Sequence, residues 1–100
     1  MAVDSDIWAF IAEGHPPGHR LPEWSERIRS LGDGVPRVCL DILENGDFTL
    51  RPAALYGLRA FGYEAWAEGY WEDEHYRVRR SPADEWLLIK PRSNMTRPTA

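Results

Sequence analysis

The chain has little cysteine and no long apolar run, and each of these features excludes a class of protein. Cys39 is the one cysteine in 100 residues, so no internal disulfide can form and the disulfide-stapled mini-proteins are excluded. Apolar runs such as residues 86–89 fall far short of the roughly 20 residues needed to span a bilayer. The first six residues are acidic and lack the plan of a signal peptide. We therefore expect a cytoplasmic protein with no membrane partner.

The sequence also lacks motifs that would name an enzyme. It contains no G-x-S-x-G, no phosphate-binding loop and no G-x-G-x-x-G. His15 and His19 are four residues apart, but Pro16, Pro17 and Gly18 separate them in a loop. His75 and Cys39 lie far away in the sequence, so no third metal ligand is evident. We expect no catalytic centre, no metal and no cofactor.

What the chain does have is enough apolar material for one core. Hydrophobic residues make up 43% of it and aromatic residues 12%, which argues against disorder. One hundred residues is the usual size of a single domain. We expect one domain over residues 1–91 and a mobile tail over residues 92–100, where the sequence loses its pattern.

Two short helices are expected in the first third of the chain. Asp4 and Ser5 are suitable N-caps for the first, and Gly14 is suitable to end it. Pro22 suits the start of the second helix, which carries apolar residues at intervals of three and four and ends at Gly32.

A β-hairpin is expected next, because residues 37–43 and residues 48–50 alternate between apolar and polar. A two-residue turn at Asn45 and Gly46 would split the apolar side chains between two faces. A three-residue loop with Gly46 in the left-handed region would instead pair Ile42 with Phe48 and unite them. We predict the second register.

The remaining elements complete an α+β fold. Pro52 can start a third helix, although a strand over part of residues 54–66 is the alternative. Residues 75–80 alternate as a strand with an exposed basic face, and residues 86–89 are apolar on both faces, as in a central strand. The predicted order is α-α-β-β-α-β-β, with helices packed on an antiparallel sheet.

The candidate site is the segment 63–74, which combines carboxylates with large aromatics and holds no basic residue. Read as a helix, it would stack carboxylates four residues apart into an acidic ridge. Charge of one sign attracts a partner of the other, and aromatics supply binding hot spots. We predict a small acidic protein-binding module, whose partner is a larger protein with a basic surface. The predicted contact residues are Glu64, Trp66, Glu68, Tyr70, Trp71, Glu72, Asp73 and Glu74.

Such a module could inhibit a basic enzyme or complex that handles nucleic acid. Small phage anti-defence proteins such as anti-CRISPRs, and immunity proteins against nuclease toxins, work in this broad way. The comparison rests on size, charge and the lack of a catalytic motif, so it is an analogy.

Charge is uneven along the chain, which leaves alternatives open. Residues 1–76 hold 14 acids and 6 arginines, a net of −8, whereas residues 77–100 hold 6 bases and 2 acids, a net of +4. Arg77, Arg79 and Arg80 form a possible basic patch for a nucleic-acid-binding regulator. The same arginines could instead neutralise the acidic ridge within the fold. A structural subunit with an aromatic homo-oligomer contact is the remaining alternative.

Overall fold

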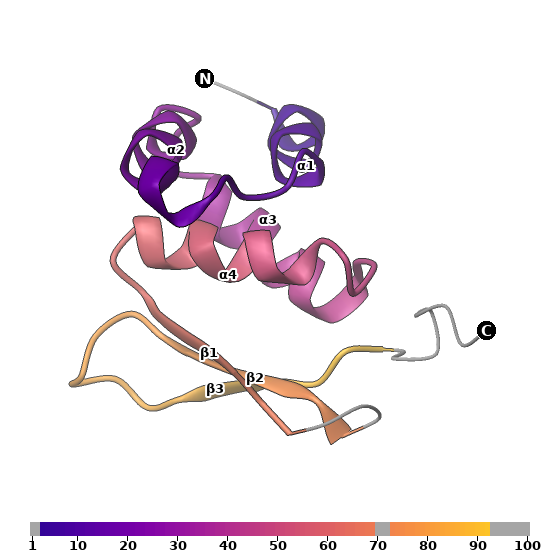
Figure 1. The fold of residues 1–100 in the computed structure, drawn as a ribbon. Helices are drawn as coiled ribbons and strands as arrows, with labels where there is room; N and C mark the ends of the chain where they lie inside the picture. The colour runs from indigo at the N-terminus through magenta and orange to yellow at the C-terminus, as the bar shows by residue number, and fades with distance from the viewer. Residues whose placement is uncertain (1–2, 70–72, 93–100) are drawn as a thin grey trace.

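The fold consists of helices stacked on one face of a small antiparallel sheet (Figure 1). The structure is a computed structural model that describes residues 3–69 and 73–92. The predicted α+β class, with helices packed on an antiparallel sheet, is confirmed. Beyond Arg92, the expected tail lies outside the described residues. In chain order the elements are α1 (Asp4–Ala12), the 3-10 helix η1 (Gly18–Arg20), α2 (Leu21–Arg29), α3 (Val35–Asn45), α4 (Arg51–Ala60), β1 (Glu64–Glu68), β2 (His75–Arg79) and β3 (Leu87–Ile89).

The molecule has three layers (Figure 1). Helices α1 and α2 form the outer layer, α3 and α4 form the middle layer, and the sheet lies on the far side of α4. The strand order is β1-β2-β3 and both pairings are antiparallel. The middle helices are therefore covered on two sides, while the described helices cover only one face of the sheet.

The hairpin predicted over residues 37–50 is wrong, because residues 35–45 form helix α3. Val35, Cys39 and Ile42 recur at helical spacing and are fully buried. The alternation of Val38, Leu40 and Ile42 is compatible with either element when an apolar run is short. Pro36 in the first turn of α3 also favours a helix start.

Gly46 does not adopt the predicted left-handed conformation. Its φ is −84° and its ψ is 164°, which is extended backbone at the end of α3. A Cβ built on Gly46 would lie 2.7 Å from the carbonyl oxygen of Ile42. Glycine is required here by close approach, and no turn joins Ile42 to Phe48 across a hairpin.

Two further boundaries differ from the sequence-based expectation. The third predicted helix is α4, but it stops at Ala60, and Gly62 turns the chain into β1 with a φ of 87°. The strand over 75–80 is confirmed as β2. The strand over 86–89 is β3, an edge strand of the described sheet, and it is not covered on both faces as predicted.

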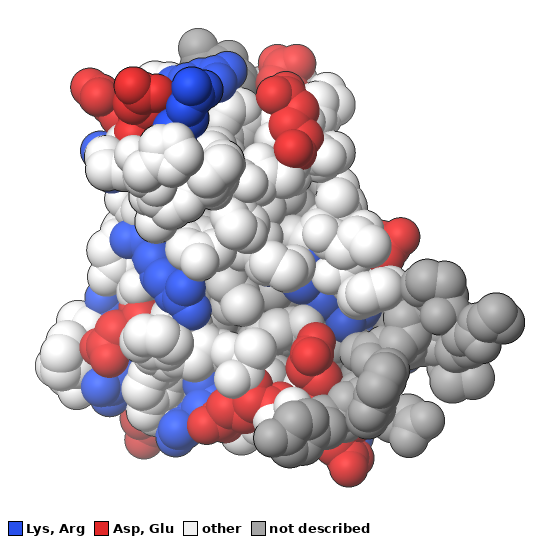
Figure 2. Space-filling model, in the orientation of Figure 1, with Lys and Arg blue, Asp and Glu red and all other residues white. Residues whose placement is uncertain are grey.

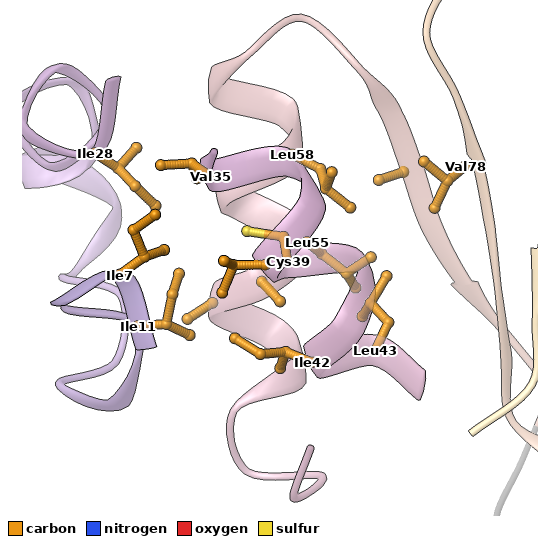
Figure 3. Close-up of a cluster of buried hydrophobic side chains, with 14 of the residues drawn as sticks. Ile7, Ile11, Ile28, Val35, Cys39, Ile42, Leu43, Leu55, Leu58 and Val78 are labelled. Atoms are coloured by element: carbon orange, nitrogen blue, oxygen red, sulfur yellow. The ribbon is translucent and has the colours of Figure 1, made fainter. Parts of the chain in front are cut away.

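The core lies between the outer helices, the middle helices and the sheet (Figure 3). Ile7 and Ile28 reach it from the outer layer, Leu58 from α4, and Val78 from β2. Helices α3 and α4 approach closely at Gly57, where a Cβ would lie 2.7 Å from the sulfur of Cys39. The other close neighbours of that Cβ would be Cδ1 of Ile28 in α2 and Cδ1 of Ile11 in α1, so Gly57 packs against helices.

Candidate functional site

The two faces of the sheet differ in what they carry. Ala65, Tyr76, Val78 and Ile89 point toward the helices and are buried. Cross-strand pairing places Glu64 opposite Arg79, Glu68 opposite His75, and Arg77 between Trp66 and Leu88. Because side chains alternate along a strand, these paired residues share the other face. We call it the open face, and its residues are Glu64, Trp66, Glu68, His75, Arg77, Arg79 and Leu88.

The predicted acidic ridge is not a helical ridge. Glu64 and Glu68 lie in β1, and the strand of arginines neutralises them within the fold, as the alternative reading of the sequence allowed. Both oxygens of Glu64 accept hydrogen bonds from Arg79, at 3.1 and 3.2 Å. Glu68 contacts the guanidinium of Arg77 and the ring of His75, each at 3.2 Å. Tyr70, Trp71 and Glu72, which were also predicted to bind the partner, lie outside the described residues.

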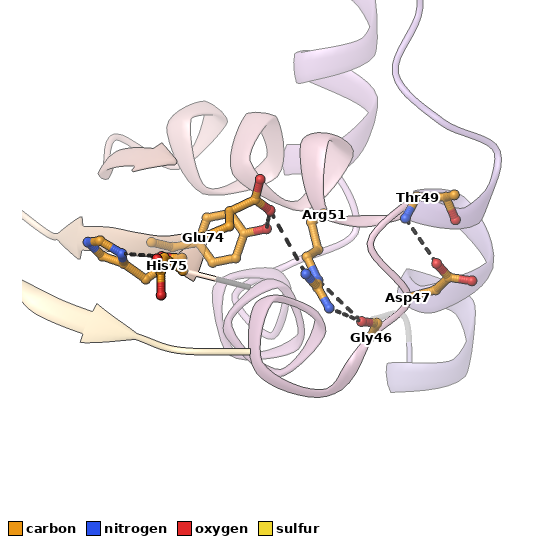
Figure 4. Close-up of polar contacts among 8 residues, drawn as sticks. Gly46, Asp47, Thr49, Arg51, Glu74 and His75 are labelled. Atoms are coloured by element: carbon orange, nitrogen blue, oxygen red, sulfur yellow. Dashed lines mark hydrogen bonds and ion pairs between the residues drawn. The ribbon is translucent and has the colours of Figure 1, made fainter. Parts of the chain in front are cut away.

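Glu74 points inward rather than toward a partner (Figure 4). Its Oε2 accepts a hydrogen bond from the hydroxyl of Tyr76 at 2.5 Å and lies 3.9 Å from Nη1 of Arg51. Arg51 is buried and also donates from Nε and Nη2 to the carbonyl oxygen of Gly46, at 3.3 and 3.1 Å. Burial, followed by the hydrogen bond to Glu74, raises the pKa of Tyr76 to about 12. Through Glu74, this cluster joins the start of α4 to β2.

Asp73, by contrast, is exposed on the surface. Its backbone carbonyl oxygen lies 2.9 Å from Nδ1 of His75 (Figure 4). Its carboxylate forms no ion pair with any residue that the structure describes. Glu64, Glu68 and Glu74 do form ion pairs, so Asp73 differs from the other predicted acidic contacts that the structure describes.

The predicted basic patch is divided. The guanidinium carbons of Arg77 and Arg79 lie 4.8 and 4.2 Å from the ring centre of Trp86, so both side chains are held by an aromatic ring and by carboxylates. Arg80 follows β2 and lies 5.9 Å from the ring centre of Tyr63. Figure 2 shows basic and acidic side chains interspersed over the sheet on the face in view. The arrangement does not form a continuous phosphate-binding surface.

Large apolar side chains are exposed on and beside the open face. Trp66 is 52% exposed, and its ring lies 4.5 Å from the guanidinium carbon of Arg59. Leu88 is 63% exposed, and its neighbour Leu87 is 53% exposed. Surface apolar groups of this size, surrounded by polar ones, are typical of protein interfaces.

Sequence reasoning named Trp66 as a contact residue and predicted a strand at residues 86–89, but it assigned neither that strand nor the carboxylates beside it to a site. Leu87, Leu88 and Ile89 form a groove of about 270 Å³ with Leu40, Asp41 and Glu44 of α3 and with Lys90. We call this the β3 groove. A second hollow, of about 410 Å³, lies on the other side of β3 and includes Asp73. The apolar run at 86–89 signalled a strand, but α3 was read as a strand too, so its carboxylates could not be placed.

Cys39 and His15, which the sequence analysis examined for reactive or metal-binding chemistry, are both described by the structure. Burial raises the pKa of the Cys39 thiol to about 12, so at neutral pH the thiolate needed for nucleophilic attack is scarce. The ring of His15 lies against Tyr56, with 4.5 Å between ring centres. Within residues 3–69 and 73–92, no group of three or more His, Cys, Asp or Glu side chains is arranged to hold a metal ion. In the same part of the chain, no helix is long and apolar enough to cross a bilayer.

No protein-family model, curated protein or solved structure matches this chain. Its functional assignment therefore rests on its own geometry, and the open face with the β3 groove is the surface where exposed apolar and charged groups meet.

Proposed function

We propose that this chain is a small protein-binding module that contacts its partner through the open face of its sheet. The observation that carries the proposal is the cross-strand row of Trp66, Arg77 and Leu88, whose two outer members are more than half exposed. Trp and Arg are the residue types most enriched among interface hot spots. A row of three side chains on adjacent strands presents them at fixed spacing on a rigid element.

Pairing within the open face prepares it for binding. Arg77 and Arg79 are held in place by Glu68, by Glu64 and by the ring of Trp86. A side chain that is already ordered loses less conformational entropy when a partner covers it. These ion pairs also make the centre of the face nearly neutral, so apolar contact would supply most of its affinity.

The partner we propose is a larger protein with a basic surface, and the module would act as its inhibitor by covering that surface. The net charge of −4 supports this choice. So do the exposed carboxylates of Asp41, Glu44 and Asp73 beside β3, which form no ion pair with the described residues. An enzyme or complex that handles nucleic acid has a basic surface, which would attract these carboxylates. Direct nucleic-acid binding is less well supported, because Arg77 and Arg79 are already engaged by carboxylates.

Affinity capture with paired variants tests the proposal. The immobilised chain is compared with Trp66→Ser/Leu88→Ser and with a control, Val3→Ser, which removes an exposed apolar side chain next to α1. Proteins retained by the wild type and the control but lost from the double variant support the proposal, once binary binding is reproduced with the purified partner. Identical capture by all three chains would refute the open face as the contact surface. Thermal melts establish that each variant is folded.

A further inference from the structure

Strand β3 lies at an edge of the described sheet. It pairs with β2 through Leu87, Leu88 and Ile89, and no described strand pairs with its other side. An edge strand presents backbone N–H and C=O groups that can pair with an added strand. Three residues of strand span about 10 Å, and Pro91, which has no N–H group, follows soon after. The edge therefore suits a short extended segment.

Helix α3 provides a wall beside this edge. Leu40, Asp41 and Glu44 line the β3 groove together with residues 87–90. In a strand added to β3, alternate side chains would point toward α3, and the others would point toward the open face. Grooves of this kind, between an edge strand and a helix, allow main-chain hydrogen bonds to give affinity while side-chain pockets give specificity.

The charges beside β3 identify the occupant. Asp41 and Glu44 lie in the groove, Asp73 lies in the hollow on the other side, and Lys90 borders both. These three carboxylates outnumber the two cationic residues beside them, Lys90 and Arg92, whose backbone N–H donates to the carbonyl oxygen of Glu44 at 2.8 Å. The excess of negative charge favours basic side chains in an incoming segment. A second copy of the chain would bring its own Asp41 and Glu44 to the same edge, where like charges oppose pairing.

We propose that the β3 groove binds an extended basic segment of a protein partner, which adds to the sheet as a fourth strand beside β3. The inference rests on the proposed function, since it describes how the proposed partner binds. It adds a recognition rule: apolar residues alternate with lysine or arginine, and the basic side chains contact Asp41 and Glu44.

Synthetic peptides test this rule on the full chain without knowledge of the partner. The first probe is a short capped peptide in which valine and lysine alternate. The second has glutamate in place of every lysine, and the third is the lysine peptide with N-methyl groups on two pairs of consecutive central residues, so that amides facing β3 are blocked in either register. Binding is followed by amide chemical shifts of the isotope-labelled protein. We expect the lysine peptide to shift residues 41–44 and 87–90 and to bind at least about tenfold more tightly than the glutamate peptide. N-methylation should abolish binding, because it removes the backbone donors.

A charge-reversed groove provides the matched variant. Asp41→Lys/Glu44→Lys should bind the glutamate peptide more tightly than the lysine peptide. The control, Glu23→Lys/Glu26→Lys, makes the same change in net charge on the exposed surface of α2 and should keep the original preference. Melting curves show that both variants fold.

Several results would overturn the inference. They are equal binding of the lysine and glutamate peptides, binding that survives N-methylation, shifts centred on another surface, and no binding at millimolar peptide. A dimer in sedimentation equilibrium, formed through β3 and blocking the peptide, would also overturn it. The two proposals fail separately: loss of capture by Trp66→Ser/Leu88→Ser together with peptide failure would leave the open face as the binding surface but exclude strand addition.

Discussion

The two faces of the sheet are built from the same strands but differ in how far their side chains are buried. On the helix-facing side, Tyr76 and Val78 are at most 2% exposed and belong to the core. On the open face, Trp66 and Leu88 are more than half exposed, yet they are large and apolar. Burial stabilises the first set, whereas the second set gains little from folding and has most to gain from a partner. We therefore expect mutations to separate the stability of the fold from the binding that we propose.

The largest difference between the two faces is expected when one leucine in the core and one leucine on the open face are each truncated to alanine. Leu58→Ala removes a fully buried side chain between α4 and the sheet and should cost about 2–5 kcal/mol of unfolding free energy, because it leaves a cavity. Leu88→Ala on the open face should cost no more than about 0.5 kcal/mol. Urea denaturation of both variants measures the difference. Equal losses would mean that the open face belongs to the core.

High pH should destabilise the folded protein through two buried groups, Cys39 and Tyr76. The pKa of Cys39 is raised from 9.0 to about 12 and that of Tyr76 from 10.0 to about 12, so the folded state holds these protons more tightly than the unfolded state. Their contribution is complete below pH 9 and falls between pH 9 and 12, by about 1.4 kcal/mol per pH unit for each group that ionises in the unfolded chain alone. Stability measured by denaturant at a series of pH values checks the slope.

The control for that slope is Cys39→Ala, which should flatten the decline between pH 9 and 10, where Tyr76 does not yet contribute. A variant whose stability declines over that interval as steeply as the wild type would contradict the assignment. Stability that rises with pH across the window would contradict the sign.

Close packing of α3 against α4 gives a smaller effect. Gly57→Ala would place a Cβ 2.7 Å from the sulfur of Cys39 and 3.1 Å from Cδ1 of Ile28. Overpacking costs about 1–3 kcal/mol, whereas alanine is preferred to glycine in a helix by up to about 1 kcal/mol. We expect a net loss of about 1 kcal/mol in thermal denaturation. A double-mutant cycle with Cys39→Ala should show favourable coupling, and additive effects would mean that the helices are not in tight contact at Gly57.

The smallest effect concerns the ion pairs that replace the predicted acidic ridge. Glu64→Lys or Arg79→Glu alone should each cost about 0.5–1 kcal/mol, because each opposes like charges across neighbouring strands. The double variant restores opposite charges and should recover most of the loss in chemical denaturation. If Glu64→Lys alone stabilised the protein, Glu64 would be part of an unneutralised acidic surface after all.

The sequence predicted the fold class and most helices, but it failed where an apolar run suits two elements. The positions of α1, α2 and α4 could be predicted from local signals: Gly14 follows α1 in the left-handed region, and α2 and α4 each have a proline in the first turn. The predicted caps Asp4 and Ser5 lie inside α1, whose N-cap is Val3. For residues 37–43 the one local marker is the preceding Pro36. An alternating pattern over a short run does not distinguish a strand from a helix. Their helical state depends on burial between two layers, which is a tertiary effect.

The candidate site was predicted in part for the same reason. Trp66, which the sequence analysis named as a contact residue, is 52% exposed and lies on the open face. The pairing of Glu64 with Arg79 and of Glu68 with Arg77 depends on strand register across sequence separations that no local pattern specifies. Asp41 and Glu44 of α3 are far from β3 in the sequence, and only the tertiary fold brings them beside it, so this proximity could not be predicted.

The central claim is that a protein partner binds on the open side of the sheet and at its β3 edge. Hydrogen–deuterium exchange of the chain, alone and with its purified captured partner, tests this claim most directly. The account expects new protection at the amides of Leu87–Ile89 and at adjacent residues of β1 and β2, with little change in α1 and α2. Protection confined to α1 and α2, with unchanged exchange throughout the sheet, would contradict it.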